Sequence, residues 1–205
     1  ERKQKIGKLF NFLYNESCAY FFSIFGFIFV LTAKLLSPWF YLRIAKWKSN
    51  RIGHQAADMD AFLRGLILRP DPKAEKKYRV YLFVTESPAN QVLLQMIRRH
   101  VHILAGKPLL RTYDILKNIF RNWPEFSAQT THRQMLAEYR LPVQLTFTNS
   151  ENKAGQKLLR KMGLPEGAPY ICFHSRDKVF LQSTLKNEDF SYHNYRDCSI
   201  TTRIP

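Results

Sequence analysis

One uncharged run near the N-terminus constrains this chain more than any other feature of its sequence. The seventeen residues 17–33 carry no charge, and apolar residues resume after Lys34 and continue to Leu42. A helix that crosses a bilayer needs about 20 apolar residues, and about 17 is the lower limit. The run therefore predicts contact with a membrane, and residues 1–42 are expected to form a membrane-attachment segment.

Basic residues flank this run on both sides. They are Lys3, Lys5 and Lys8 before it, and Arg43, Lys46, Lys48 and Arg51 after it. Basic flanks on both sides assign no orientation by the positive-inside tendency. A monotopic helix, lying in the interface or bending back near Ser37 and Pro38, keeps both flanks at anionic headgroups and is favoured. A single span and a soluble core helix remain the alternatives, whereas a signal peptide fits poorly because no small-residue cleavage site follows.

The whole chain is strongly basic. Its net charge is +16, of which +7 comes from nine Lys/Arg and two acidic residues within residues 1–53. Such an excess indicates an anionic partner, which the neighbouring apolar run suggests is a membrane with anionic lipids. A nucleic-acid partner would rest on charge alone and is not expected. Three widely spaced cysteines, Cys18, Cys172 and Cys198, are typical of free thiols in a reducing compartment.

Strand-like and helix-like segments alternate along the rest of the chain. Strands are expected at residues 42–47, 78–84, 143–147 and 170–173, and helices at 56–68, 88–101, 109–120 and 151–162, the last with Leu158 and Leu159 facing inward. This alternation predicts an α/β fold with a mostly parallel, Rossmann-like sheet and helices on both faces.

Three polar clusters occupy positions where such a sheet binds ligands, in the loops at the carboxyl ends of strands. An arginine can pair with phosphate, a histidine can transfer a proton near neutral pH, and a glycine lets a ligand approach the backbone closely. An ordinary polar turn explains the first two clusters about as well, whereas the two tyrosines of the third favour a site. The candidates are Arg51, Gly53 and His54; His174, Arg176 and Asp177; and Tyr192, His193, Arg196 and Asp197.

No metal site is expected. Asp58-Met59-Asp60 has the DxD spacing of metal-dependent sugar transferases, but it lies at the start of a predicted helix. Acidic residues at that position are explained by the helix dipole. His100 and His102 have no third ligand nearby in the sequence.

The motifs Arg51-Ile52-Gly53-His54, Phe173 to Asp177 (FHSRD) and Tyr192 to Asp197 (YHNYRD) together resemble a family of bacterial glycosyltransferases of surface polysaccharide biosynthesis. The resemblance implies that residues 43–205 form the Rossmann-like N-terminal lobe of a two-lobed GT-B fold. That lobe usually receives the acceptor, here a surface-polysaccharide or lipid-linked glycan, while the second lobe holds most of a nucleotide-sugar donor. No further cofactor is implied, and the place of action would be the cytoplasmic face of the bacterial inner membrane.

The candidate residues can be given roles in such a reaction. His54 or His174 would be the general base, with Asp177 near His174, and Arg51, Arg176 and Arg196 would neutralise the diphosphate. The second lobe that the resemblance implies is missing from these 205 residues. A fragment, a partner chain that supplies the lobe, and a protein that has lost catalysis all fit this pattern. The alternative function is therefore a non-catalytic, membrane-attached scaffold.

Overall fold

A computed structural model describes residues 2–126, 140–172, 191 and 195, with the backbone alone for residues 2–5. The chain divides into two compact units, Glu1–Thr148 and Asn149–Pro205. In the second unit, helix α6 (Asn149–Lys161) has no buried residue and is followed by Gly163 with a φ of 87°. All elements that position the described part of the candidate site belong to the first unit.

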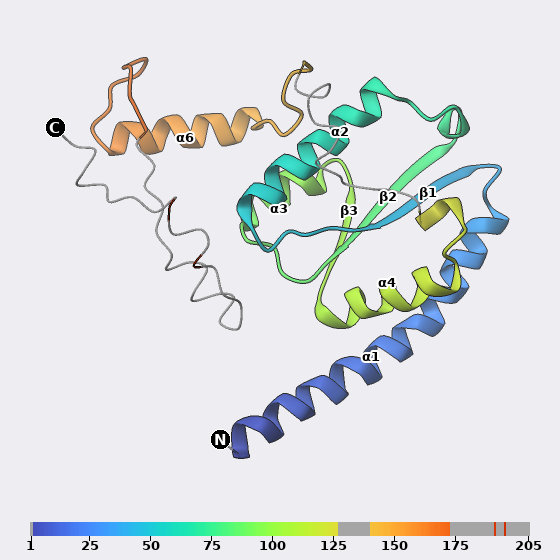
Figure 1. The fold of residues 1–205 in the computed structure, drawn as a ribbon. Coiled ribbons are helices and arrows are strands. Elements are labelled where there is room, and N and C mark those ends of the chain that lie inside the picture. Colours follow the sequence, from blue (N-terminus) through green and yellow to red (C-terminus); the bar gives the residue numbers. More distant parts are fainter. Residues whose placement is uncertain (1, 127–139, 173–190, 192–194, 196–205) are drawn as a thin grey trace. The chain divides into compact units, whose positions relative to one another are not determined.

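The first unit is built on a parallel sheet. Strands β1 (Phe40–Lys46), β2 (Tyr78–Thr85) and β3 (His102–Ala105) lie in the order β1-β2-β3 (Figure 1). Strand β1 buries residues on both of its faces, which is typical of a parallel sheet covered by helices on two sides. Leu42 and Ile44 belong to the core of one face, and Ala45 to the core of the other, as the two-residue period of a strand requires.

One face of this sheet is covered by the helices that connect its strands. A π-helical turn η1 (His54–Asp58) leads into α2 (Met59–Leu68) between β1 and β2, and α3 (Gln91–Arg98) connects β2 to β3. Their buried side chains form one core with the strands, made by Ala45, Trp47, Met59, Leu63, Phe83, Leu94, Ile97, Val101 and Ile103. This core holds the segment after β1 in place.

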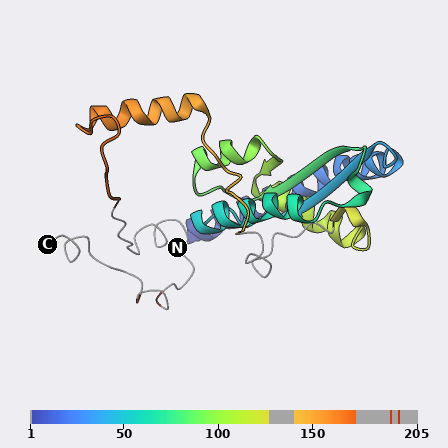
Figure 2. The same ribbon diagram turned by 90° about the horizontal axis from the view of Figure 1, so that it is seen from above.

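The opposite face is covered by α1 (Arg2–Leu35), α4 (Lys107–Ile119) and the short turn η3 (Pro124–Phe126). Their common core consists of Val30, Leu42, Ile44, Val84, Tyr113, Leu116, Phe120 and Phe126. Helix α1 runs without a break toward the start of β1 and lies beside α4 (Figures 1 and 2). The N-terminal helix is therefore part of the domain, which has a layer of helices on each side of its sheet.

The residues of α1 that pack most closely on α4 are mostly small. Ala19 and Val30 are fully buried, and Ser23, Gly26 and Ala33 are half-buried. A Cβ atom at Gly26 would lie 2.6 Å from Leu116 Cδ1, and the Thr112 hydroxyl donates to the Ala19 carbonyl at 3.1 Å. The small side chains thus allow the backbones of α1 and α4 to approach closely.

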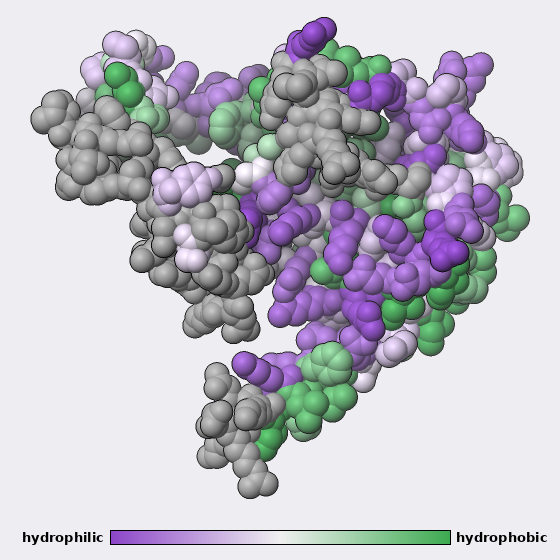
Figure 3. Space-filling view, viewed as in Figure 1, coloured by the Kyte–Doolittle hydropathy of each residue, from purple (hydrophilic) through white to green (hydrophobic). Residues whose placement is uncertain are grey.

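Many bulky apolar side chains of α1 remain largely exposed, although Phe27 also contacts the Phe120 ring at the end of α4, with 5.3 Å between the ring centroids. At least 39% of each remains exposed in Tyr20, Phe21, Phe22, Ile24, Phe25, Phe27, Ile28, Phe29 and Leu31. A helix of a soluble protein has the reverse distribution, with its large apolar side chains in the core. Figure 3 shows the resulting hydrophobic surface along α1, next to the hydrophilic surface over α4.

Helix α1 is long and apolar enough to cross a membrane. The candidate stretch is Ile6–Leu35, and only 11% of its most apolar window is buried. A core helix of a soluble protein would be mostly buried, whereas a membrane anchor and a signal sequence both fit this length and composition. The expected apolar N-terminal segment is confirmed as one long helix.

Several expected elements are confirmed and others are wrong. The strands near residues 42–47 and 78–84 and the helices near 56–68, 88–101 and 109–120 are present, although α3 begins after Asn90, whose side chain accepts from the Leu93 amide at 2.9 Å. The four-residue strand β3 is not among the expected elements. Residues 170–172 form no strand, and Phe173 lies outside the described residues. Leu158 is 59% exposed rather than inward.

Residues 143–147 are not a strand either. The amides of Gln144 and Leu145 donate to the Asp60 carboxylate on α2, at 2.7 and 3.2 Å. The Leu141 carbonyl accepts from Arg64 Nη1 at 2.9 Å, also on α2. Because Asp60 and Arg64 of α2 bind this backbone, residues 141–145 lie against α2 instead of joining the sheet.

Two glycines allow a matched test of this backbone. Gly106, before α4, has φ 148° and ψ 146°, which residues other than glycine rarely adopt, whereas Gly53 is helical at φ −61° and a Cβ there would have no atom within 4 Å. We expect Gly106→Ala to lower the free energy of unfolding by about 1–3 kcal/mol. Gly53→Ala should raise it by about 0.5–1 kcal/mol. Urea unfolding followed by tryptophan fluorescence measures both, and equal stability of the two variants would contradict the assigned conformations.

Candidate functional site

The carboxyl ends of β1 and β2 are tied together by a pair of buried hydroxyl groups. Ser49 Oγ and Thr85 Oγ1 are 2.5 Å apart, and each residue is 1% exposed. The Ser49 carbonyl also accepts from the Ala89 amide at 2.8 Å. The loops that leave the two strands are therefore fixed to each other at the edge of the sheet where ligands bind in this class of fold.

A buried glutamine adds a second connection between these loops. The Gln55 side chain donates to the Asn90 carbonyl at 2.7 Å and accepts from the Asn90 amide at 2.8 Å, and the residue is fully buried. The side chain thereby satisfies both backbone polar groups of Asn90, the residue directly before α3. Nothing in the local sequence singles out Gln55, because its role depends on a residue 35 positions away.

His54 and Asp58 form a pair within the π-helical turn. His54 Nδ1 lies 3.2 Å from Asp58 Oδ2, and the side chains are 28% and 7% exposed. A carboxylate at Nδ1 favours the tautomer with its proton on that atom, which leaves the lone pair on Nε2. This arrangement suits a general base, and π-helical turns of this kind are frequent at functional sites.

Arg51 and Gly53 lie in the same segment, directly before this pair. Arg51 is half-buried, and Gly53 is exposed, with no atom within 4 Å of the position that a Cβ would take. Its helical φ of −61° requires no glycine. A glycine that neither the backbone conformation nor the packing requires is compatible with a ligand that approaches the backbone closely. Three of the predicted site residues thus share one segment at the end of β1.

The chain changes from one face of the sheet to the other after β3 and then returns to β1. Helices α2 and α3 cover one face, while α4 leaves β3 and packs on the other. The turn η3 after α4 contacts β1, and Phe126 shares a core with Leu42 and Ile44. In doubly wound sheets the ligand crevice lies at the carboxyl ends of the strands where the connections change direction.

Two ion pairs fix α4 to this edge of the sheet. Lys46, the last residue of β1, is 3.1 Å from Asp114, and Lys107 is 3.3 Å from Glu86, which follows β2. All four side chains are more than a third exposed, so each pair contributes about 1 kcal/mol or less. Their contribution is mainly to orient α4, and Lys107 adds a cation near the start of that helix.

The carboxylates of the DxD sequence bind within the chain. Asp60 pairs with Arg64 and accepts the amides of the segment near residue 144, while Asp58 pairs with His54. Asp58 makes no capping hydrogen bond at the start of α2, so these contacts do not test the expected effect of the helix dipole. The other candidate residues all lie outside the described residues: His174, Arg176, Asp177, Tyr192, His193, Arg196 and Asp197.

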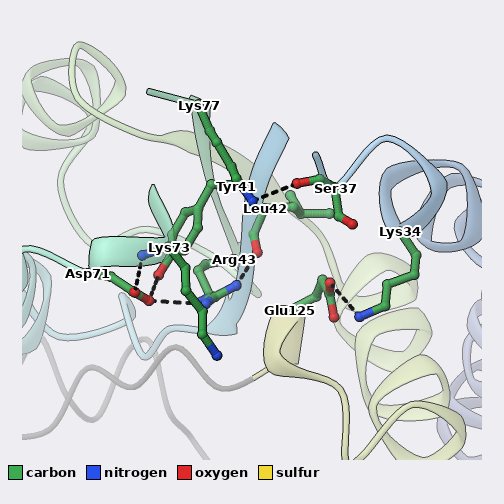
Figure 4. Close-up of polar contacts among 9 residues, drawn as sticks. All are labelled: Lys34, Ser37, Tyr41, Leu42, Arg43, Asp71, Lys73, Lys77 and Glu125. Carbon is green, nitrogen blue, oxygen red and sulfur yellow. Dashed lines mark hydrogen bonds and ion pairs between the residues drawn. The ribbon is translucent and has the colours of Figure 1, made fainter. Parts of the chain in front are cut away.

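A second polar cluster lies at the opposite end of the sheet, near the start of β1 (Figure 4). Asp71 accepts from the Tyr41 hydroxyl at 2.5 Å, from Arg43 Nη2 at 3.3 Å and from the Lys73 amide at 2.9 Å. Lys77 donates to the Ser37 carbonyl at 2.8 Å in the turn after α1. These contacts connect the turn after α1 and the start of β1 to the segment that leads into β2.

This cluster shifts the pKa values of its own groups. The hydrogen bond from Tyr41, followed by that from the Lys73 amide, holds the pKa of the Asp71 carboxyl below its ordinary value. Burial, together with the Asp71 carboxylate, raises the pKa of the Tyr41 hydroxyl. The two shifts are consistent, since the hydroxyl donates and the carboxylate accepts. The cluster is a structural clip that shares no residue with the candidate site.

Comparison with known proteins found no matching family model, no matching curated protein and no matching solved structure. What the geometry defines is an α/β domain with a three-stranded parallel sheet and an apolar N-terminal helix. Its function is therefore argued from the residues at the carboxyl end of the sheet and from the surface of α1.

The clip at Asp71 predicts a pH-dependent contribution to stability. Because the pKa of Asp71 is lowered in the folded state, its contribution is present above the ordinary aspartate pKa of about 3.9 and is lost as the pH falls through the lowered value. We expect Asp71→Asn to cost about 1 kcal/mol at pH 7, a small amount because the carboxyl is a third exposed. The difference from the parent chain should shrink below pH 4. Thermal unfolding from pH 7 to pH 3 measures it, and a constant difference would exclude the charged contact.

Proposed function

We propose that this chain is the acceptor-side lobe of a GT-B-type glycosyltransferase that works at a membrane surface. It would transfer a sugar from a nucleotide-sugar to a surface-polysaccharide or lipid-linked acceptor at the cytoplasmic face of a bacterial inner membrane. The observation that carries the proposal is the His54–Asp58 pair, 3.2 Å apart, beside Arg51 at the carboxyl end of β1. The reaction class comes from the resemblance of the three motifs together, of which Arg51–His54 is the one within the described residues.

In the proposed reaction, His54 is the general base, Asp58 supports it and Arg51 binds the leaving group. His54 Nε2 takes the proton of the acceptor hydroxyl, and the Asp58 carboxylate stabilises the imidazolium that forms. The acceptor oxygen forms a bond to the anomeric carbon, whose bond to the diphosphate oxygen breaks. The nucleoside diphosphate leaves with that electron pair, and Arg51 offsets its negative charge. The fixed loops around Ser49 and Gln55 keep these side chains in place.

The packing of α1 supports attachment in the membrane interface rather than a span. Between Glu16 and Lys34, α1 lies against α4, and Arg111 of α4 pairs with Glu16 at 3.0 Å. A spanning α1 would bring the α4 residues Arg111, Asp114 and Lys117 to the depth of the hydrocarbon, at about 2.5–3.5 kcal/mol for each charge near the centre. In the interface, only the bulky outer side of α1 enters the lipid while α4 stays in water.

Membrane attachment is tested by removing apolar side chains from the outer side of α1. Phe21, Ile24 and Ile28 are 56–62% exposed, so their replacement by serine leaves the core intact. Burial of each side chain in lipid is worth about 1.5–3 kcal/mol, so the triple variant should bind vesicles at least about 100-fold more weakly. Flotation with phosphatidylglycerol vesicles measures this binding. A matched triple serine variant at Ile67, Val92 and Val143, which are equally exposed on other elements, should bind like the parent chain.

Catalysis is tested at His54. In membranes of cells that express the chain, His54→Ala should lower sugar transfer from labelled nucleotide-sugars to lipid about 10²–10⁴-fold, the usual contribution of a general base. Asp58→Asn should lower it less, because the histidine remains. His100→Ala, an exposed histidine after α3, is the control and should keep full activity. Full activity of His54→Ala would remove His54 from the reaction, and vesicle binding without any transfer by the parent chain would favour the scaffold.

Gly53→Ala separates function from stability. The substitution should stabilise the helix, as expected from its φ of −61°. If a phosphate-bearing ligand approaches the backbone here, the same variant should lose at least about tenfold in transfer, equivalent to about 1.4 kcal/mol. Unchanged transfer would show that no ligand contacts this position.

A further inference from the structure

An apolar groove lies between α1, α4 and the sheet, on the side away from α2 and α3. It has a volume of about 300 Å³, and its walls include Phe22 and Phe25 of α1, Leu104 of β3, and Leu109 and Tyr113 of α4. Besides the tyrosine, the one hydroxyl in the lining belongs to Thr112, which is hydrogen bonded to the Ala19 and Pro108 carbonyls. Such a surface offers a ligand almost no polar contact. The volume of the groove is at the lower end of the range of small-molecule pockets.

The groove is continuous with the outer surface of α1. Phe22, Phe25 and Phe29 line it, yet they remain 39%, 57% and 48% exposed. The same side chains therefore form a wall of the groove and part of the exposed apolar surface of α1. An apolar surface exposed to water is unfavourable by about 25 cal/mol for each Å², so a hydrocarbon ligand is favoured to cover it.

The other end of the groove reaches the carboxyl edge of the sheet. Val84 and Leu104 line it, and each is the next-to-last residue of its strand. Leu109, in the first turn of α4, is two residues after Lys107, whose side chain is 67% exposed. A molecule that lies along the groove thus has one end toward lipid and the other toward the start of a 13-residue helix, which favours an anion, beside the Lys107–Glu86 ion pair at 3.3 Å.

We propose that the groove holds one hydrocarbon chain of a phosphate-bearing membrane lipid, with its headgroup at the carboxyl edge near Lys107. The inference rests on the proposed membrane attachment and deepens it, because it places a lipid substrate on the same edge as His54. Two features select this occupant over a protein helix or a soluble ligand: the continuity with the aromatic surface of α1, and the start of α4 with the exposed Lys107 at the far end. The headgroup phosphate would compete with the Glu86 carboxylate for Lys107, while the hydrocarbon chain supplies most of the binding energy.

Photolabelling of the full chain in vesicles tests the proposal. The probe is phosphatidylglycerol with a diazirine at the end of one acyl chain, at low density in phosphatidylcholine vesicles. After irradiation, mass spectrometry should locate label on groove residues of α1 and α4, such as Phe25 and Leu109. A probe of phosphatidylcholine carrying the same diazirine should label the groove at least about fivefold less, because its headgroup has no net charge to pair with Lys107.

Filling the groove gives the decisive comparison. Leu109→Trp should lower groove labelling at least about fivefold while flotation with vesicles is unchanged, because the larger side chain takes the space of the hydrocarbon chain. Leu104→Trp, at a position already 41% exposed, provides a second variant should the first fold poorly. Ile119→Trp is the matched control, since Ile119 is 56% exposed on α4 and does not line the groove, and it should label like the parent chain.

The possible failures are distinguishable. A parent chain that does not float with vesicles overturns the membrane attachment itself, and with it this inference. A chain that floats but carries label only on outward residues such as Phe21, Ile24 and Ile28, unchanged by the tryptophan substitutions, overturns the groove alone. Equal labelling by the two lipid probes overturns the headgroup site at Lys107.

Discussion

The close packing of α1 on α4 is the contact on which the rest of this structure depends. Small residues at positions 19, 23, 26 and 33 allow the approach, and Leu116 fills the space that a side chain at Gly26 would take. Because the domain occupies this side of α1, aromatic side chains such as Phe21 face outward, whereas Phe22, Phe25 and Phe29 border the groove beside α4. A helix that would otherwise be a detachable anchor thereby becomes a layer of the fold, and its Val30 belongs to the same core as Leu42 and Ile44 of the sheet.

The sequence predicts the strongly periodic parts of this fold and misses what depends on distant partners. The apolar run, β1, β2, α2 and α4 follow from composition and spacing. Strand β3 has only four residues, too few for a pattern of its own. Residues 143–147 alternate like a strand, but Asp60 binds their amides, and that contact links positions 84 and 85 residues apart.

The candidate site shows the same division. Arg51, Gly53 and His54 can be selected from the sequence because they follow a predicted strand, and the chain necessarily keeps them together. In the sequence, Asp58 stands out only as part of a metal motif. Its pairing with His54 could still have been predicted, because residues four positions apart on a helix lie side by side. Gln55 and the Ser49–Thr85 pair give no such signal, because each acts through a residue about 35 positions away.

The turn after α1 determines how the candidate site is placed relative to the apolar helix α1. Only four residues separate Leu35 from Phe40, and the Trp39 and Phe40 amides both donate to the Leu36 carbonyl, at 3.0 and 2.9 Å. Lys77 binds the Ser37 carbonyl from the segment before β2, and Lys34 reaches Glu125 at 3.5 Å (Figure 4). A flexible linker would let a tethered domain take many heights above a bilayer. Here the last turn of α1 is joined at several points to β1 and its neighbours, so the depth of α1 in the interface would also determine the height of the carboxyl edge of the sheet. A lipid-borne acceptor would then meet that edge at a fixed distance from the membrane surface, which suits a transfer reaction in which orientation supplies much of the rate.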